Sequence, residues 1–255
     1  MRRNKPMING FCETSQEPKM ENAYLSWPNT GLVAARNKTK GVNVVDLFLD
    51  DVIGSQFGGV SPKQFNEELS AAGEVDRINL YINSPGGSVF DGIAMYNTLR
   101  GAKAEVVVEV TGLAASAASV VMLAGDVRRM AESSFVMIHD PWDMTMGSAE
   151  VHRIKSDRLS MYAAKIASIY ERHTDLTADQ AQEMMSMDKG DGTWFDSEEA
   201  IELGFVGEVT EPTKMAAHVT DFVRYFSSTR SSVSTRTKKI DKRLDFMKRH
   251  SLKSR

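Results

Sequence analysis

Along the middle of the chain, segments with a strand-like pattern of apolar residues alternate with segments whose apolar residues recur at helical spacing. Segments dense in Val, Ile and Leu predict strands over residues 42–53, 77–82, 105–112, 135–138 and 205–209. Apolar residues at helical spacing predict helices over residues 61–72, 89–102, 114–123 and 148–173, with two shorter helices opening at Thr177 and Ser197. Strands that alternate with helices are typical of an α/β domain built from βαβ units.

Capping residues support several of these helix boundaries. Ser61 stands directly before a proline, and Thr177 has Gln180 three positions later, so both hydroxyl residues are predicted N-caps. Gly73 and Gly204 are predicted to end helices, because glycine readily adopts the left-handed conformation found there.

The length of 255 residues suits one ordinary domain with extensions. We predict a mostly irregular N-terminal extension over 1–40, a folded domain over 41–212, and a basic tail, helical or disordered, over 213–255. The net charge of −3 is unevenly divided: residues 230–255 hold ten basic and two acidic residues, a net of +8, which leaves −11 on the rest. Such a tail either binds an acidic partner, such as nucleic acid, or is a solvated end.

The composition restricts the class of function. Cys12 is the single cysteine, so no internal disulfide can form, and the five histidines are scattered, which does not fit a zinc site. No apolar run approaches the roughly 18 residues of a membrane span. The basic first residues lack the apolar stretch of a secretory signal. We therefore expect a cytoplasmic protein that needs no cofactor or metal and does not associate with a membrane.

Two strand-to-helix junctions have unusual sequences. At the first, Gly86 and Gly87 separate a strand from a helix, which is typical either of a plain turn or of backbone N–H groups that hold an anion. At the second, Ser116 is surrounded by alanines that leave its hydroxyl unshielded, as for a nucleophile at such a turn. The competing interpretation is a closely packed helix of small residues, and Ser119 is a second candidate nucleophile.

His139 follows a buried strand and precedes a loop, a suitable place for a general base. A serine hydroxyl is a weak nucleophile, so it needs a base within hydrogen-bond reach, and the base needs an acceptor that orients it. The order serine, histidine, aspartate along the chain is acceptable, because such triads are defined by geometry.

Together these segments resemble the Clp protease proteolytic subunit family, over about residues 42–209. More specifically, they are similar to the phage and prophage branch known as head maturation proteases. The motifs that carry the resemblance are RINLYINSPGGSVFDGIAMYNTLR, GLAASAASVVMLAG, FVMIHDPW and TWFDSEEAIELGFVGEV. The resemblance implies the α/β fold shared with crotonases, a superhelical core of βαβ units with a long handle helix, here residues 148–173.

The resemblance also implies roles for individual residues. Ser116 is the expected nucleophile, His139 the base and Asp188 the third triad member, and the backbone N–H groups of Gly87 and Ala117 are the expected oxyanion-hole donors. After Asp188 this chain inserts four residues, 189–192, so Asp191 is an alternative for the third role.

The family pattern further implies a homo-oligomeric ring, stacked in sevens in the family, that cleaves polypeptide substrates. In a phage setting these would be scaffold or capsid proteins, and the protein would act in the host cytoplasm or the assembling prohead. The N-terminal region does not match the axial loops that receive ATPase unfoldases, so such a partner is not expected.

Three other interpretations remain. A crotonase-type acyl-CoA enzyme would use the two turns to hold a thioester enolate, but it has no use for a Ser-His-Asp set. A signal-peptide-peptidase relative would need a lysine base and a membrane anchor. A catalytically silent assembly subunit would keep the fold without activity, since a displacement of about 1 Å in such a triad can cost on the order of a hundredfold in rate.

Overall fold

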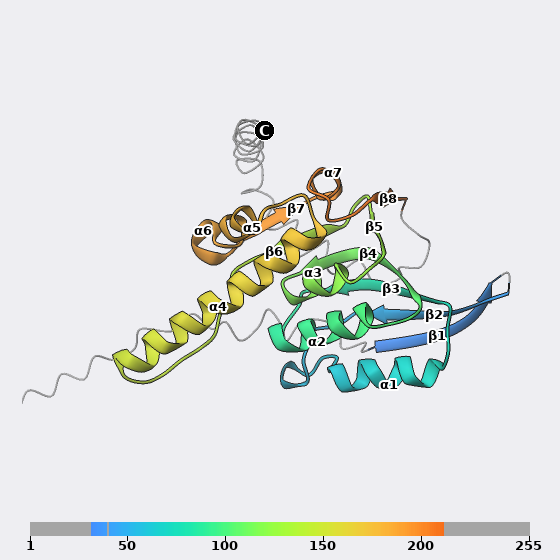
Figure 1. Ribbon diagram of the computed structural model, residues 1–255, viewed down its shortest axis with the longest axis horizontal. Helices are drawn as coiled ribbons and strands as arrows, with labels where there is room; N and C mark the ends of the chain where they lie inside the picture. The colour runs from blue at the N-terminus through green and yellow to red at the C-terminus, as the bar shows by residue number, and fades with distance from the viewer. Residues whose placement is uncertain (1–31, 40, 212–255) are drawn as a thin grey trace, which may run out of the picture.

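The computed structural model describes residues 32–39 and 41–211 (Figure 1). Its centre is a mixed sheet in which the strands run in the order β1-β2-β3-β4-β5-β8. The antiparallel pair β1–β2 forms one edge, and all further pairs along this order are parallel. The strands are β1 (Leu32–Thr39), β2 (Val42–Leu49), β3 (Arg77–Ser84), β4 (Glu105–Ala115), β5 (Val127–Ala131) and β8 (Glu208–Thr210).

Three helices follow one another along the sheet and enclose the apolar core with it (Figure 1). They are α1 (Pro62–Ala72), α2 (Val89–Arg100) and α3 (Ala117–Met122), and α2 packs against both others. The short 3₁₀ helix η2 (Ser55–Phe57) lies between β2 and α1. The Ser61 side chain accepts a hydrogen bond from the N–H of Gln64, so the predicted N-cap of α1 is confirmed. The predicted α/β fold class is also confirmed.

Strand β4 pairs with two different strands on the same side. Its first part, Val107–Val110, pairs with β5, and its end, Leu113–Ala115, pairs with β6 (Phe135–Ile138). Strand β6 then pairs on its other side with the antiparallel β7 (Thr193–Phe195). Because β3, β4 and β6 are parallel, their carboxyl ends meet at one edge of the sheet.

The long helix α4 (Ala149–His173) extends away from the body of the molecule (Figure 1). Its buried residues all belong to the C-terminal half, which packs against α3 and α5 (Ala178–Met185). The half from 149 to 162 has no buried residue, and it presents Val151, Ile154 and Met161 to solvent.

The segment between α5 and β7 is less regular. The turn α6 (Met187–Gly190) has left-handed backbone at Asp188 (φ 50°) and Lys189 (φ 67°). After β7, helix α7 (Ser197–Glu202) leads to β8. The capping box predicted at Thr177 is present at the start of α5, with both reciprocal hydrogen bonds to Gln180.

The structure departs from the sequence expectations in several places. The hairpin pairs Leu32 with Leu49 and Thr39 with Val42, so ordered strand begins before the expected boundary at residue 41. Ala114 and Ala115 extend β4 and do not belong to the following helix. The last strand is Glu208–Thr210, a few residues later than expected. Residues 1–31 and the basic tail lie outside the described part of the chain.

Strand β5 was not predicted at all. Its sequence contains Arg128 and Arg129, which interrupt an apolar pattern. Arg128 donates to the backbone carbonyls of His173 and Gly204, and Arg129 forms an ion pair with Glu208. Tertiary contacts, rather than local preference, hold this strand in the sheet.

Candidate active site

The register of three parallel strands brings the predicted site residues together. Ser84 at the end of β3 is opposite Ala114, and Ala115 at the end of β4 is opposite Met137 on β6. The residues that follow these strand ends therefore lie side by side: the glycine turn after β3, Ser116 after β4, and His139 after β6.

Ser116 occupies a strained turn between β4 and α3. Its backbone has φ 55° and ψ −125°, a conformation that side-chain-bearing residues rarely adopt and that costs about 1–3 kcal/mol. The N–H of Ser116 donates to the carbonyl of Met137 over 2.8 Å, which ties the turn to β6. The alanines on both sides are buried, and the Ser116 side chain is half-buried.

The imidazole of His139 faces the Ser116 hydroxyl. The distance from His139 Nε2 to Ser116 Oγ is 2.8 Å, a hydrogen bond between candidate base and candidate nucleophile. Burial lowers the pKa of His139 below its ordinary value of 6.5, while the charges of Asp140 and Asp191 oppose that shift. A low pKa keeps the imidazole neutral near pH 7, which is the form that accepts a proton.

The turn between α6 and β7 lies against His139. A Cβ added at Gly192 (φ +82°) would meet the carbonyl oxygen of Ile138 at 2.0 Å and the Cβ of His139 at 2.5 Å. A backbone hydrogen bond with Gly190 raises the pKa of His139, so in this contact the ring is the donor. Asp188 lies within α6 and Asp191 directly follows that helix, and Asp140 and Asp191 are the two carboxylates whose charges raise the pKa of His139.

The glycine turn after β3 packs closely on the Ser116 turn. A Cβ at Gly86 (φ +88°) would lie 2.5 Å from the carbonyl oxygen of Ala115 and 2.7 Å from the Cβ of Ser116. A Cβ at Gly87 (φ +143°) would meet the carbonyl oxygen of Ile53 at 2.1 Å. Both positions therefore require glycine.

The two residues expected to donate to an oxyanion adjoin the Ser116 turn along the chain: Gly87 follows Gly86, which packs on that turn, and Ala117 follows Ser116 directly. Gly87 forms a parallel bridge to Ile53 through its neighbours, since Ile53 donates to the Gly86 carbonyl and Ser88 donates to Ile53. The N–H of Gly87 itself therefore points to the other side. Ala117 is the first residue of α3, where a helix N–H lacks an intrahelical partner.

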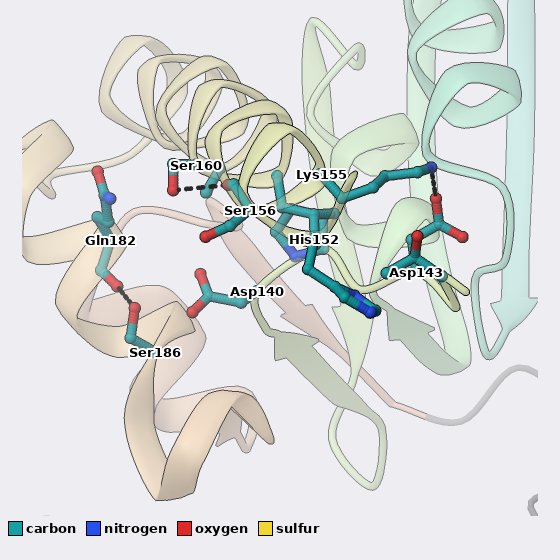
Figure 2. A pocket seen from close by; sticks show the side chains of 12 residues that line it. Asp140, Asp143, His152, Lys155, Ser156, Ser160, Gln182 and Ser186 are labelled. Atoms are coloured by element: carbon teal, nitrogen blue, oxygen red, sulfur yellow. Dashed lines mark hydrogen bonds and ion pairs between the residues drawn. The ribbon is translucent and has the colours of Figure 1, made fainter. Parts of the chain in front are cut away.

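A polar cavity of about 400 Å³ begins beside His139. Figure 2 shows it between α4, α5 and the segment after β6, bordered by Asp140, Lys155 and Gln182 among others. Lys155 forms an ion pair with Asp143. The hydroxyls of Ser160 and Ser186 donate to backbone carbonyls of their own helices, so they present only oxygen lone pairs. Neither Ser116 nor His139 lines this cavity.

Among residues 32–39 and 41–211, no group of three or more His, Cys, Asp or Glu side chains is arranged to hold a metal ion. None of the helices in that part of the chain combines the length and apolar character needed to cross a bilayer.

Comparison with known proteins gives a consistent family. The sequence model of the Clp protease family matches residues 66–213, more than half of the chain. The ATP-dependent Clp protease proteolytic subunit 1 of Salinibacter ruber is 30% identical over 196 residues, covering 71% of this chain and 82% of that protein. The subunit 1 of Streptomyces coelicolor is 36% identical over 144 residues, covering 55% and 64%, respectively. The proteolytic subunit of Deinococcus radiodurans is 32% identical over 148 residues, covering 57% and 71%.

The fold and these matches define a peptidase of the serine type. The chain belongs to the Clp protease family.

The structure brings together most of the residues that the sequence indicated. Ser116 and His139 are hydrogen-bonded, Ala117 follows Ser116 at the start of α3, and Gly87 follows Gly86, which packs on the Ser116 turn. Ser119, the second candidate nucleophile, is fully buried, and its hydroxyl faces Tyr170. Sequence reasoning missed Gly192, whose close approach to His139 is visible only once β7 is paired with β6.

The fit of the glycine turn can be tested with a pair of alanine substitutions. Gly86→Ala should reduce labelling of Ser116 by a fluorophosphonate probe at least tenfold, because its Cβ would displace the Ser116 turn. Gly73→Ala is the matched control, since Gly73 has a similar φ of +73° but open space around its Cβ. It should cost about 1 kcal/mol of stability and leave labelling unchanged. Equal labelling of the two variants would contradict the proposed contact.

Proposed function

We propose that the protein is an endopeptidase in which Ser116 is the nucleophile and His139 the general base. The observation that carries this proposal is the 2.8 Å hydrogen bond between Ser116 Oγ and His139 Nε2 at a strained strand-to-helix turn. A lone serine or histidine is usually structural, whereas this pair is half-buried, close and next to glycine-lined backbone.

The reaction follows from this geometry. Ser116 Oγ forms a bond to the carbonyl carbon of the scissile peptide while its proton moves to His139 Nε2. The carbon–nitrogen bond then breaks, and His139 gives the proton to the leaving amine. Water hydrolyses the resulting ester by the same steps in reverse order, which regenerates the hydroxyl.

The tetrahedral intermediate carries a negative oxygen that needs hydrogen-bond donors. We assign this task to the N–H groups of Gly87 and Ala117, because Ala117 follows Ser116, Gly87 follows the glycine that packs on the Ser116 turn, and the bridge of Gly87 to Ile53 does not use its N–H. Fixed donors of this kind commonly supply the largest single part of the rate enhancement.

The third triad position is proposed from the electrostatics of His139. The resemblance implies Asp188, but Asp191 is one of the two carboxylates whose charges raise the pKa of His139, and its neighbour Gly190 makes a backbone hydrogen bond to the ring. We therefore propose Asp191 as the residue that stabilises the imidazolium, with Asp188 as the alternative.

The substrates are proposed from the motifs. The sequence is similar to the head maturation branch of the family, so we propose that this peptidase processes scaffold or capsid proteins in an assembling phage head. The relatives described above have names that include ATP dependence. The proposal for this chain includes no ATPase partner.

We also propose that the protein acts as a homo-oligomer in which α4 contributes to the interface. The N-terminal half of this helix has no buried residue within one chain, yet it presents Val151, Ile154 and Met161. Burying such side chains against another copy would remove apolar surface from water, at about 25 cal/mol per Å².

The nucleophile and base are tested by probe labelling with identification of the modified residue by mass spectrometry. Wild-type protein should be labelled at Ser116, and Ser116→Ala should lose both label and peptidase activity while remaining folded. His139→Ala should also lose the label, because the hydroxyl then has no base. Retained label in Ser116→Ala, with loss in Ser119→Ala, would move the nucleophile. Absence of label on assembled wild-type protein would favour the silent-subunit interpretation.

The third position is tested by three asparagine variants and their pH profiles. In wild-type protein, the midpoint of the acid limb in the pH profile of kcat/KM should lie below pH 6.5, because burial lowers the pKa of His139. Asp140→Asn and Asp191→Asn each remove an anion that raises this pKa, so both should move the limb to still lower pH. Asp191→Asn should in addition lower kcat about a hundredfold or more. Asp140→Asn controls for the loss of charge alone and should keep kcat within a few-fold. A full loss of activity in Asp188→Asn, with Asp191→Asn active, would return the role to Asp188.

Assembly is tested by placing a charge on the exposed apolar face of α4. Ile154→Glu should reduce the mass of the particle measured by light scattering, because a carboxylate would have to be buried in the interface. Ser160→Glu introduces the same charge at another exposed position of the same helix and should leave the mass unchanged. An unchanged mass for Ile154→Glu would place the interface elsewhere.

A further inference from the structure

Two buried hydroxyl groups lie directly behind the nucleophile. Ser119 on α3 is completely buried, and Tyr170 on α4 is 1% exposed. The Ser119 hydroxyl donates to the backbone carbonyl of Ser116 over 2.6 Å. The same hydroxyl oxygen is 2.7 Å from the hydroxyl of Tyr170. The reaction steps described above use neither side chain.

The direction of these hydrogen bonds follows from the groups involved. A carbonyl oxygen can only accept, so the single hydrogen of the Ser119 hydroxyl points to Ser116. Tyr170 must then donate to the Ser119 oxygen. Burial raises the pKa of Tyr170 far above its usual value, so its hydrogen is always present. The result is a chain of donors that runs from Tyr170 through Ser119 to the Ser116 carbonyl.

This carbonyl belongs to the peptide group that also contains the Ala117 N–H. A peptide is planar and trans, so its C=O and N–H point in opposite directions, and fixing one fixes the other. The N–H of Ser119 donates to the same carbonyl over 3.0 Å, which gives the oxygen two donors from one residue. These two hydrogen bonds from Ser119 therefore fix the orientation of the Ser116–Ala117 peptide plane.

The need for such a hold comes from the strain at Ser116. Ser116 has a positive φ of 55°, which is unfavourable for a residue with a side chain and persists only where surrounding contacts hold the backbone in place. The hydrogen bond from the Ser116 N–H to Met137 holds one end of the residue, and the Ser119 contacts hold the other.

We infer that Ser119 and Tyr170 are positioning residues, which orient the Ser116–Ala117 peptide so that the Ala117 N–H points at the oxyanion. The inference rests on the proposed function, in which that N–H stabilises the tetrahedral intermediate. Neither side chain touches the substrate. Their effect is on the transition state, because the oxyanion exists only there.

The experiment compares Ser119→Ala and Tyr170→Phe with two matched controls in the full-length protein. Ser134→Ala removes a hydroxyl from a residue that is almost as buried, at 1% exposed, and that also donates over 2.6 Å to a carbonyl three residues earlier, that of Ala131. Tyr96→Phe removes a tyrosine hydroxyl that is hydrogen-bonded to His173. Each control loses the same kind of contact, away from the Ser116–Ala117 peptide.

For Ser119→Ala we expect kcat and the rate of fluorophosphonate labelling to fall about tenfold, with KM unchanged. Tyr170→Phe should show a smaller loss of the same kind, because Ser119 keeps its bond to the carbonyl. The acid limb of the pH profile should stay in place, since the contact between His139 and Ser116 is not altered. Ser119→Cys, which retains a weak donor, should recover part of the rate. The two controls should lower thermal stability and leave kcat unchanged.

The inference is overturned if Ser119→Ala and Tyr170→Phe, each folded, lose no more kcat than their controls. It is also overturned if the loss lies in KM, or if the acid limb moves. If Ser119→Ala fails to fold, Tyr170→Phe and Ser119→Cys decide by the same criteria. Failure of the proposed function has a different outcome, because wild-type protein itself would then show no labelling at Ser116.

Discussion

The arrangement of this protein depends on the pairing of one strand with two partners. Strand β4 pairs first with β5 and then, beyond Val110, with β6. The change of partner moves the end of β6 next to the end of β4, so that Ser116 can donate to Met137 and face His139. A shift of one residue in this register would turn the histidine side chain to the opposite face of the sheet. The apolar burial along β4 is what resists such a shift, since Val108 and Val110 are completely buried.

The small residues around Ser116 have two separate consequences. They leave the Ser116 hydroxyl accessible, which the sequence already indicated. They also let backbone segments approach, because the Ala117 side chain lies close to α2, where a Cβ at Gly92 would come within 2.9 Å of it. The same close packing brings Gly86 against Ser116. Ser116 is thus held by backbone on several sides, and strain at this residue is offset by contacts at its neighbours.

Much of this architecture could be predicted, because its strongest elements follow simple rules. Strand β3 alternates in burial along its whole length, as its sequence of alternating polar and apolar residues indicates. Helix α4 begins within one residue of its expected start and ends at His173, as predicted. The pairing of Ser116 with His139 was indicated by their positions at strand ends and by the family motifs. The features that sequence could not reveal are those set by distant contacts: β5 with its two arginines, the placement of the 188–192 turn, and the hydroxyl of Tyr170 behind α3.

The order in which the site residues occur along the chain has a consequence for synthesis. The centre combines a turn after β3, a serine after β4, a histidine after β6 and the turn before β7. Strand β7 (Thr193–Phe195) holds that turn in place by pairing with β6. A polypeptide leaves the ribosome N-terminus first, and its early segments can fold before later ones exist. The chain that has emerged as far as Ser116 therefore carries this hydroxyl without His139, and the turn that packs against His139 arrives more than seventy residues later. Nearly the whole described domain has therefore been translated before the centre can close, and in the proposed peptidase a shorter chain lacks the turn that supports the base.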